Sequence, residues 1–174
     1  MTKLLLYSCC AMLIISCGDK TNTTSETSSK DTLHYAYTAA YSSKFEHGKN
    51  EQAQKVLDLW MQYDKNDFSG SAPYFADTVT INLTNGMVAH GQKDSVIAMI
   101  KGARSRFDSV RSIVNAWIPL HSIDKDTYWV SVWGVEFDSK GAKTDSIIIT
   151  ENWRFDKNGK IDYMEQYSAV PPKQ

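Results

Sequence analysis

The spacing of apolar residues changes along the chain from a helical period to an alternating one. Apolar residues recur every three or four positions from about residue 51 to 63 and again from Gly91 to Phe107, which predicts two helices. A third, short helix is predicted from Ala72 to Ala76, because Pro73 suits the first turn of a helix. Alternation of polar and apolar residues elsewhere predicts strands. These strands cover residues 78–83 and roughly 111–121, 127–137, 145–155 and 160–168.

Short polar turns separate the predicted strands, as at Asn85-Gly86 and at Asp156-Lys157-Asn158-Gly159. Consecutive strands that are joined by such short connections pair in the antiparallel direction. Most of the helices come first and most of the strands last, so the sequence predicts an α+β domain built on an antiparallel sheet.

Four segments in this order resemble the SnoaL-like, nuclear transport factor 2-like domain. They are Val56-Leu57-Asp58-Leu59-Trp60, Tyr74-Phe75-Ala76-Asp77, Gly91 with Val96-Ile97, and the run from Trp153 to Ile161. The resemblance covers about residues 46–168. It implies a cone-like fold in which a curved antiparallel sheet wraps round three helices. Because this fold hosts many activities, the resemblance indicates architecture and not function.

The chain begins with a basic residue, Lys3, followed by an apolar run from Leu4 to Ile15. About twelve apolar residues are fewer than the roughly 20 that span a bilayer, so the run indicates a cleaved signal peptide. Its end, Ile14-Ile15-Ser16-Cys17, resembles the lipobox of bacterial lipoproteins. This resemblance implies lipid on Cys17 and a protein on the exported side of a cell-envelope membrane, with inner or outer membrane left open.

Three parts are therefore expected. Residues 1–16 form the signal peptide, residues 17–45 a Ser/Thr-rich tether and a weakly patterned segment, and residues 46–170 the SnoaL-like domain. Within the tether, Asp31-Thr32-Leu33 resembles the acceptor pattern for O-glycans on exported proteins of Bacteroidota, and the sequence leaves its modification open.

The composition of the chain excludes several kinds of chemistry and several kinds of partner. The three cysteines are Cys9, Cys10 and Cys17, so the domain has no thiol for a disulfide, a metal or nucleophilic catalysis. The chain has 19 basic and 20 acidic residues and no basic block, which excludes nucleic acid as an expected partner. Four scattered histidines predict no metal site, and no cofactor fingerprint is present.

A curved sheet closed by helices leaves a cavity, and aromatic residues suited to line it are abundant. Alternation groups Trp129, Ser131, Trp133, Val135 and Phe137 on one strand face, and Ile147, Ile149, Glu151, Trp153 and Phe155 on the next. If both faces point inward, they give the cavity indole walls. The predicted lining residues are Trp60, Tyr63, Tyr74, Phe75, Trp117, Trp133, Trp153 and Tyr167.

Glu151 is the carboxylate on the second of these faces. Burial there would raise its pKa and let it act as an acid or a base. A position at the cavity rim, or a pairing with Arg154, is the alternative. His90, just before the predicted helix at Gly91, is a second candidate proton carrier, although such histidines are commonly solvated. Ketosteroid isomerase-like relatives carry an acid near Thr80–Leu83, and this chain has none there.

The leading hypothesis is a membrane-anchored module whose cavity binds a small, mostly apolar or aromatic ligand. One alternative is a cofactor-free isomerase, dehydratase or hydrolase that uses Glu151. The other is a homodimeric scaffold that pairs through the face of the sheet and has no activity in the cavity.

Overall fold

The structure is a computed structural model that describes residues 34–171. The predicted signal peptide, the lipidated Cys17 and Asp31-Thr32-Leu33 lie outside the described residues. From Tyr37 onward the chain forms one compact unit.

The described residues contain two α-helices, one 3-10 turn and seven strands. In chain order they are β1 (Phe45–His47), α1 (Asn50–Lys65), η1 (Ala72–Tyr74), β2 (Phe75–Asn82), β3 (Val88–Gln92), α2 (Lys93–Arg104), β4 (Ser109–Ser122), β5 (Thr127–Lys140), β6 (Lys143–Phe155) and β7 (Ile161–Ala169).

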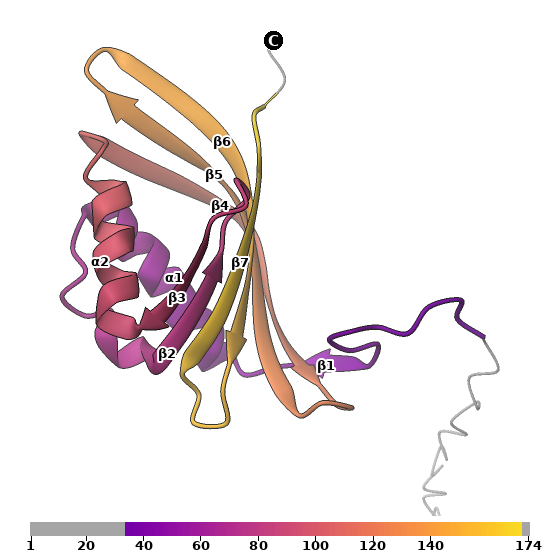
Figure 1. The fold of residues 1–174 in the computed structure, drawn as a ribbon. Coiled ribbons are helices and arrows are strands. Elements are labelled where there is room, and N and C mark those ends of the chain that lie inside the picture. The colour runs from indigo at the N-terminus through magenta and orange to yellow at the C-terminus, as the bar shows by residue number, and fades with distance from the viewer. Residues whose placement is uncertain (1–33, 172–174) are drawn as a thin grey trace, which may run out of the picture. The chain divides into compact units, whose positions relative to one another are not determined.

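All seven strands belong to one sheet, in the order β1-β4-β5-β6-β7-β2-β3. The antiparallel run from β4 to β7 confirms the predicted meander. β2 joins it at the edge of β7 and runs parallel to that strand. The sheet curves, and both helices lie on one side of it (Figure 1). The predicted α+β fold with a curved sheet is therefore confirmed, with one parallel pairing added.

Two of the three predicted helices differ from the structure. The helix predicted at Ala72–Ala76 is a single 3-10 turn, because Phe75 is already extended and begins β2. The helix predicted from Gly91 begins at Lys93, because the preceding residues form β3 and pair with β2. Gly86, with a φ of 80°, makes the turn between these two strands possible.

The hydrophobic core lies between the helices and the concave side of the sheet. Val56 on α1 packs with Val130 and Val132 on β5 and with Phe155 on β6, and all four are nearly inaccessible to solvent. A buried side chain of this size contributes about 1.5–3 kcal/mol. The core therefore fixes α1 across the middle strands of the sheet.

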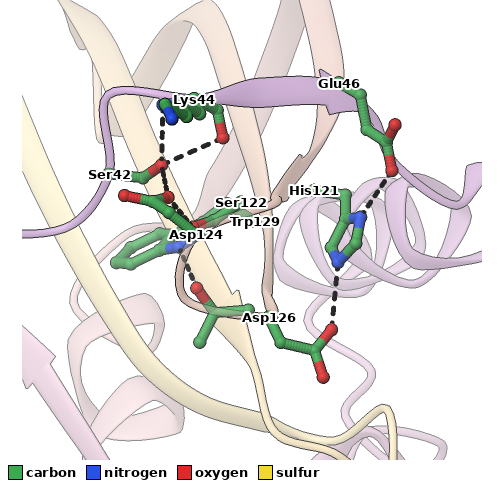
Figure 2. A network of polar contacts seen from close by, with 9 residues as sticks. Ser42, Lys44, Glu46, His121, Ser122, Asp124, Asp126 and Trp129 are labelled. Carbon is green, nitrogen blue, oxygen red and sulfur yellow. Dashed lines mark hydrogen bonds and ion pairs between the residues drawn. The ribbon is translucent and has the colours of Figure 1, made fainter.

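A short N-terminal segment is attached to the far edge of the sheet. β1 pairs with β4. Gly48, the residue after β1, packs so tightly against β4 that an added Cβ would lie 2.8 Å from the backbone of Leu120. His121 holds the segment through Glu46 on β1, at 2.7 Å, and also contacts Asp126 at 3.1 Å (Figure 2).

The residues just before β1 contact the side of the sheet that faces away from the helices. The Ser42 hydroxyl donates to Asp124 (Figure 2), and the ring of Tyr41 lies 5.0 Å from that of Trp129. Trp129 is only 6% exposed. This indole is therefore buried although it points away from the core.

Candidate functional site

A cavity of about 290 Å³ lies between α1, α2 and the concave side of the sheet. Most of its lining is apolar, and its polar groups gather on the strands and on α1. The apolar lining includes Leu59, Phe68, Phe75, Ile81, Ile97, Ile100, Phe107, Ile147, Ile149 and Met164, and the polar lining includes Tyr63, Ser112, Glu136, Asp138, Glu151, Gln166 and Ser168. A cavity of this composition suits a small organic molecule.

Glu151 lies inside this cavity, 7% exposed, and not at a rim. One carboxylate oxygen accepts the indole N–H groups of Trp60, at 2.6 Å, and Trp153, at 3.0 Å. The other accepts the Gln166 amide at 3.0 Å. Arg154 pairs with Asp162 instead, so the predicted alternative partner of Glu151 is engaged elsewhere. Burial raises the pKa of Glu151, and the three hydrogen bonds oppose that rise.

Glu151 therefore fixes the two indoles that form part of the cavity wall. Trp60 comes from α1 and Trp153 from β6, and both are less than one-tenth exposed. Gly134 on β5 leaves room for Trp60: an added Cβ would lie 2.7 Å from the indole ring and from the backbone oxygen of Ile113. Sequence reasoning missed this signal, a glycine in the middle of a strand.

The inward face of β5 is the opposite of the predicted one. Val130, Val132, Gly134, Glu136 and Asp138 point toward the helices, as the pairing of Val132 with Glu151 requires. The prediction of indole walls depended on the face with Trp129 and Trp133 pointing inward. Trp129 is buried on the other side instead, under Tyr41.

Glu136 and Asp138 bring two further carboxyl groups into the cavity, and sequence reasoning missed both. Burial, together with the neighbouring carboxyl groups of Asp138 and Glu151, raises the pKa of Glu136 to about 8. Burial also raises the pKa of Asp138, which is 5% exposed. One oxygen of Asp138, Oδ1, has no hydrogen-bond partner. The pair therefore favours a state that retains a proton near neutral pH.

Arg104, whose charge acts on Asp138, donates its hydrogen bonds to the backbone. It donates to the carbonyl oxygens of Tyr63 at 2.8 Å, Phe107 at 2.9 Å and Asp64 at 3.2 Å. Its charge lowers the pKa of Asp138 but does not cancel the effect of burial. Arg104 is not part of the cavity lining. Its hydrogen bonds join the end of α2 to the end of α1.

Four of the eight predicted lining residues line the cavity, namely Trp60, Tyr63, Phe75 and Trp153. The pKa of Tyr63 is raised by burial, so its phenol stays protonated. Four others do not line it. Tyr74 donates to Asp58 at 3.0 Å, Trp133 and Tyr167 are exposed on the outer side of the sheet, and Trp117 is 52% exposed on β4.

His90 does not lie at the cavity. It belongs to β3 instead of a loop, is exposed, and contacts the Thr80 hydroxyl at 2.8 Å through Nδ1. A role for His90 in chemistry within the cavity is therefore excluded by its position.

Residues 34–171 contain neither a cluster of metal ligands nor a helix suited to cross a membrane. No group of three or more His, Cys, Asp or Glu residues in this range is arranged to hold a metal ion. None of the helices in the same range combines the length and the apolar character that crossing a membrane requires.

The comparisons identify the fold. No protein-family model and no curated protein matches the chain. Among solved structures, an NTF2-like protein from Exiguobacterium sp. 255-15 matches with 21% identity and a TM-score of 0.52, over 68% of this chain and 98% of that one. Another NTF2-like protein, from Cytophaga hutchinsonii, matches with 15% identity and a TM-score of 0.51, over 67% and 97%.

An enzyme is similar as well. The epoxide hydrolase/cyclase-like enzyme of pyran ring formation in polyether salinomycin matches with 14% identity and a TM-score of 0.55, over 69% of this chain and 92% of that one. The described unit therefore has the NTF2-like fold, as the resemblance in the sequence implied. At these identities, the similarity establishes the fold alone.

Proposed function

We propose that the cavity binds a small, mostly apolar or aromatic ligand, on a domain that lipid on Cys17 tethers to a bacterial membrane. The observation that carries the first half is the cavity of about 290 Å³, whose walls include two indoles that Glu151 fixes in place. Aromatic walls that are already ordered lose little conformational entropy when a ligand binds.

A neutral fluorescent probe tests this proposal. N-phenyl-1-naphthylamine fluoresces weakly in water and strongly in an apolar cavity, so we expect saturable enhancement with the purified protein. Ile149→Glu would place a charge in the lining and abolish the enhancement, whereas Ile123→Glu, in the exposed turn after β4, would leave it unchanged. An absence of enhancement with the folded wild-type protein would contradict the proposal.

The lipid anchor is supported by the four residues that resemble a lipobox. Metabolic labelling with an alkyne-bearing fatty acid is expected to label the wild-type protein and to leave it in the membrane fraction. Cys17→Ser should lose both the label and the membrane association, and Cys10→Ser should retain both. A labelled Cys17→Ser variant would rule out this anchor.

Acid–base catalysis is a second candidate function, and the observation that favours it is the pair of carboxyl groups, Glu136 and Asp138, in the lining of the cavity. A carboxyl group that titrates at about 8 can accept a proton from a bound ligand and return it to another atom of the same ligand. The similar structure of the salinomycin cyclase-like enzyme supports this reading at the level of fold. Glu136 and Asp138 then replace Glu151 as the reacting groups, because the oxygens of Glu151 are occupied by three donors.

Deuterium exchange measures this activity without knowledge of the substrate. The α C–H groups of 2-tetralone exchange slowly in D2O, and we expect the protein to accelerate the exchange and Glu136→Gln to remove the acceleration. Equal rates with wild-type protein and with buffer would count against catalysis by proton transfer for ligands of this class.

We further propose that two copies associate through the outer side of the sheet. Two neighbouring rows of side chains there contain no charged residue: Ile113, Val135, Ile148 and Ala169, and Ala116, Trp133, Thr150 and Tyr167. Ile113, Trp133, Ile148 and Tyr167 are 38–56% exposed. A neutral apolar patch of this kind complements a second copy of itself.

A further inference from the structure

The charges in the cavity are all of one sign. Glu136, Asp138 and Glu151 belong to its lining, and no described residue of that lining is Lys, Arg or His. The surrounding side chains are mostly apolar, so water screens these charges poorly. The cavity therefore disfavours a carboxylate or phosphate ligand and favours a ligand that carries a positive charge.

We propose that the cavity selects ligands that combine an apolar body with a protonated amine, and that Glu136 and Asp138 bind the ammonium group. This inference rests on the proposed function of the cavity as a ligand site. It adds the chemical class of the ligand and the two residues that select it.

The hydrogen bonds of the site distinguish this pair from Glu151. Both oxygens of Glu151 already accept N–H groups, from Trp60, Trp153 and Gln166. Asp138 is 5% exposed, and its Oδ1 accepts no N–H or hydroxyl group of the described residues. Its carboxyl group is hydrogen-bonded to that of Glu136 only while the pair holds a proton. A buried acceptor without a donor costs about 1–3 kcal/mol, and an ammonium N–H group would remove that cost. Asp138 is therefore the group in the cavity that a donor ligand satisfies best.

The cations and donors around the pair do not fill this role. Arg104 directs its guanidinium to three backbone carbonyls and is not part of the cavity lining. Asp64, a further carboxylate near Glu136, accepts the backbone N–H and the hydroxyl of Ser112 at 2.9 and 2.8 Å. The pair thus faces the cavity with its charge incompletely compensated.

The aromatic residues of the cavity suit the same ligand. The faces of tryptophan and tyrosine rings attract cations, by about 0.5–2 kcal/mol at partly desolvated sites. Trp60, Trp153 and Tyr63 all line the cavity that contains the carboxyl pair. An apolar amine therefore meets favourable contacts along its whole length, whereas an apolar carboxylate meets repulsion at its charged end.

Three probes with the same naphthalene body test the proposal. They are 2-naphthylmethylamine, 2-naphthylmethanol and 2-naphthoate, each used to displace N-phenyl-1-naphthylamine from the purified protein near neutral pH. We expect the amine to bind at least about tenfold more tightly than the alcohol, and the carboxylate to bind most weakly. Isothermal titration calorimetry checks the same order without the fluorescent probe.

Matched variants assign the selectivity to the pair. The double variant Glu136→Gln, Asp138→Asn keeps the size of both side chains, and we expect it to lose most of the preference for the amine while its affinity for the alcohol stays within about twofold. Asp94→Asn removes one charge on the exposed face of α2 and should keep the full preference. Binding of N-phenyl-1-naphthylamine by each variant shows that its cavity is intact, and Glu136→Gln alone serves if the double variant does not fold.

The outcomes separate the inference from the proposed function. Failure of N-phenyl-1-naphthylamine to bind overturns both. Binding of this probe together with equal affinities for amine and alcohol overturns the selectivity alone. A preference that survives in a folded charge-neutral variant overturns the assignment to Glu136 and Asp138.

Discussion

Glu151 and Glu136 lie on neighbouring strands and face the same cavity, yet their carboxyl groups have different surroundings. Glu151 accepts three N–H groups, which stabilise its charged form. Glu136 is hydrogen-bonded to another carboxyl group on the same strand, that of Asp138, whose charge raises its pKa. Burial raises the pKa of both, but only Glu136 has no donor that opposes the rise. Glu151 therefore supports the walls, and Glu136 is the group that exchanges a proton.

This difference predicts how stability depends on pH. The pKa of Glu136 rises from 4.5 to about 8 in the folded protein, so the folded state binds its proton more tightly than the unfolded state. Stability is therefore lost as the pH rises from about 4.5 to 8, and Glu136→Gln removes that loss. We expect the variant to be more stable than the wild type at pH 9, by about 1–3 kcal/mol, and nearly equal to it at pH 4.

Urea unfolding at both pH values measures the difference. The groups that face Glu136 are Asp138 on β5, Glu151 on β6, and Asp64 and Tyr63 on α1. The charge-matched control is Asp94→Asn, which should show no such dependence. A Glu136→Gln variant that is destabilised equally at both pH values would show that ionisation of Glu136 does not lower the free energy of unfolding.

Gly134 is the residue on which the shape of the cavity wall depends. An added Cβ would lie 2.7 Å both from the Trp60 ring and from the backbone oxygen of Ile113, and neither has room to move freely. We expect Gly134→Ala to destabilise the protein by about 1–3 kcal/mol and to weaken ligand binding, because Trp60 is displaced from Glu151. Gly102→Ala on α2 is the control: nothing lies within 4 Å of its added Cβ, so stability should be unchanged or should rise. Chemical denaturation of both variants is the measurement, and equal stability would refute the steric argument.

The residues of the site could be predicted from the sequence only where one strand face is clearly apolar. β6 alternates from Ile149 to Phe155, and its inward face contains Glu151 as predicted from the pattern. β5 has large apolar residues on both faces, since Trp129 and Trp133 alternate with Val130 and Val132. Periodicity alone cannot choose between two such faces, and the predicted indole walls depended on the face that contains the tryptophans. The choice fails because Tyr41, which comes from a distant part of the chain, covers Trp129.

At the level of elements, long segments were predicted better than short ones. The two helices and the four long strands have enough residues for their periods to be read, and their positions agree with the structure to within a few residues. β3 was missed and η1 was mistaken for a helix, because each has only three to five residues and is defined by pairing or packing with β2. The parallel pairing of β2 with β7 could not be predicted, because neither strand has a sequence pattern that identifies its partner.

The attachment of β1 to the sheet is expected to depend on pH, because His121 contributes to it. Hydrogen bonds to Glu46 and Asp126 raise the pKa of this imidazole, whose ring also stacks on Tyr128 at 4.3 Å. A histidine with a raised pKa stabilises fully below its ordinary pKa of about 6.5 and loses this effect as the pH rises through the raised value. We therefore expect β1 to open more readily at alkaline pH.

Hydrogen exchange of the β1 amides measures this opening. After correction for intrinsic rates, protection of Phe45–His47 should fall by roughly two- to fivefold between pH 6 and pH 9. His121→Gln should remove the dependence, and His90→Gln, which alters an exposed histidine on β3, should keep it. Protection in the wild type that is constant with pH would show that backbone pairing alone holds β1.

For the molecule as a whole, the two sides of the sheet suit two different partners. The concave side, covered by the helices, contains a mostly apolar cavity with three carboxyl groups, which suits a ligand with an apolar body and an ammonium group. The opposite side presents neutral rows that suit another copy of the chain. The two sites are compatible because side chains that alternate along a strand point to opposite sides. Association of two copies would therefore leave the cavity open to its ligand.

Trp133 provides the test of this association. It lies within the neutral rows, with Ala116 and Thr150 as its paired neighbours. In a symmetric dimer, each copy places this residue in the same self-complementary patch, so Trp133→Lys would bring two like charges into one apolar interface. We expect sedimentation velocity to give a dimer for the wild-type protein and a monomer for this variant. Trp117→Lys is the matched control, since Trp117 is also exposed but pairs with Val132 and so points to the other side of the sheet. A wild-type protein that stays monomeric at hundreds of micromolar, or a Trp117→Lys variant that dissociates as readily, would refute the proposed interface.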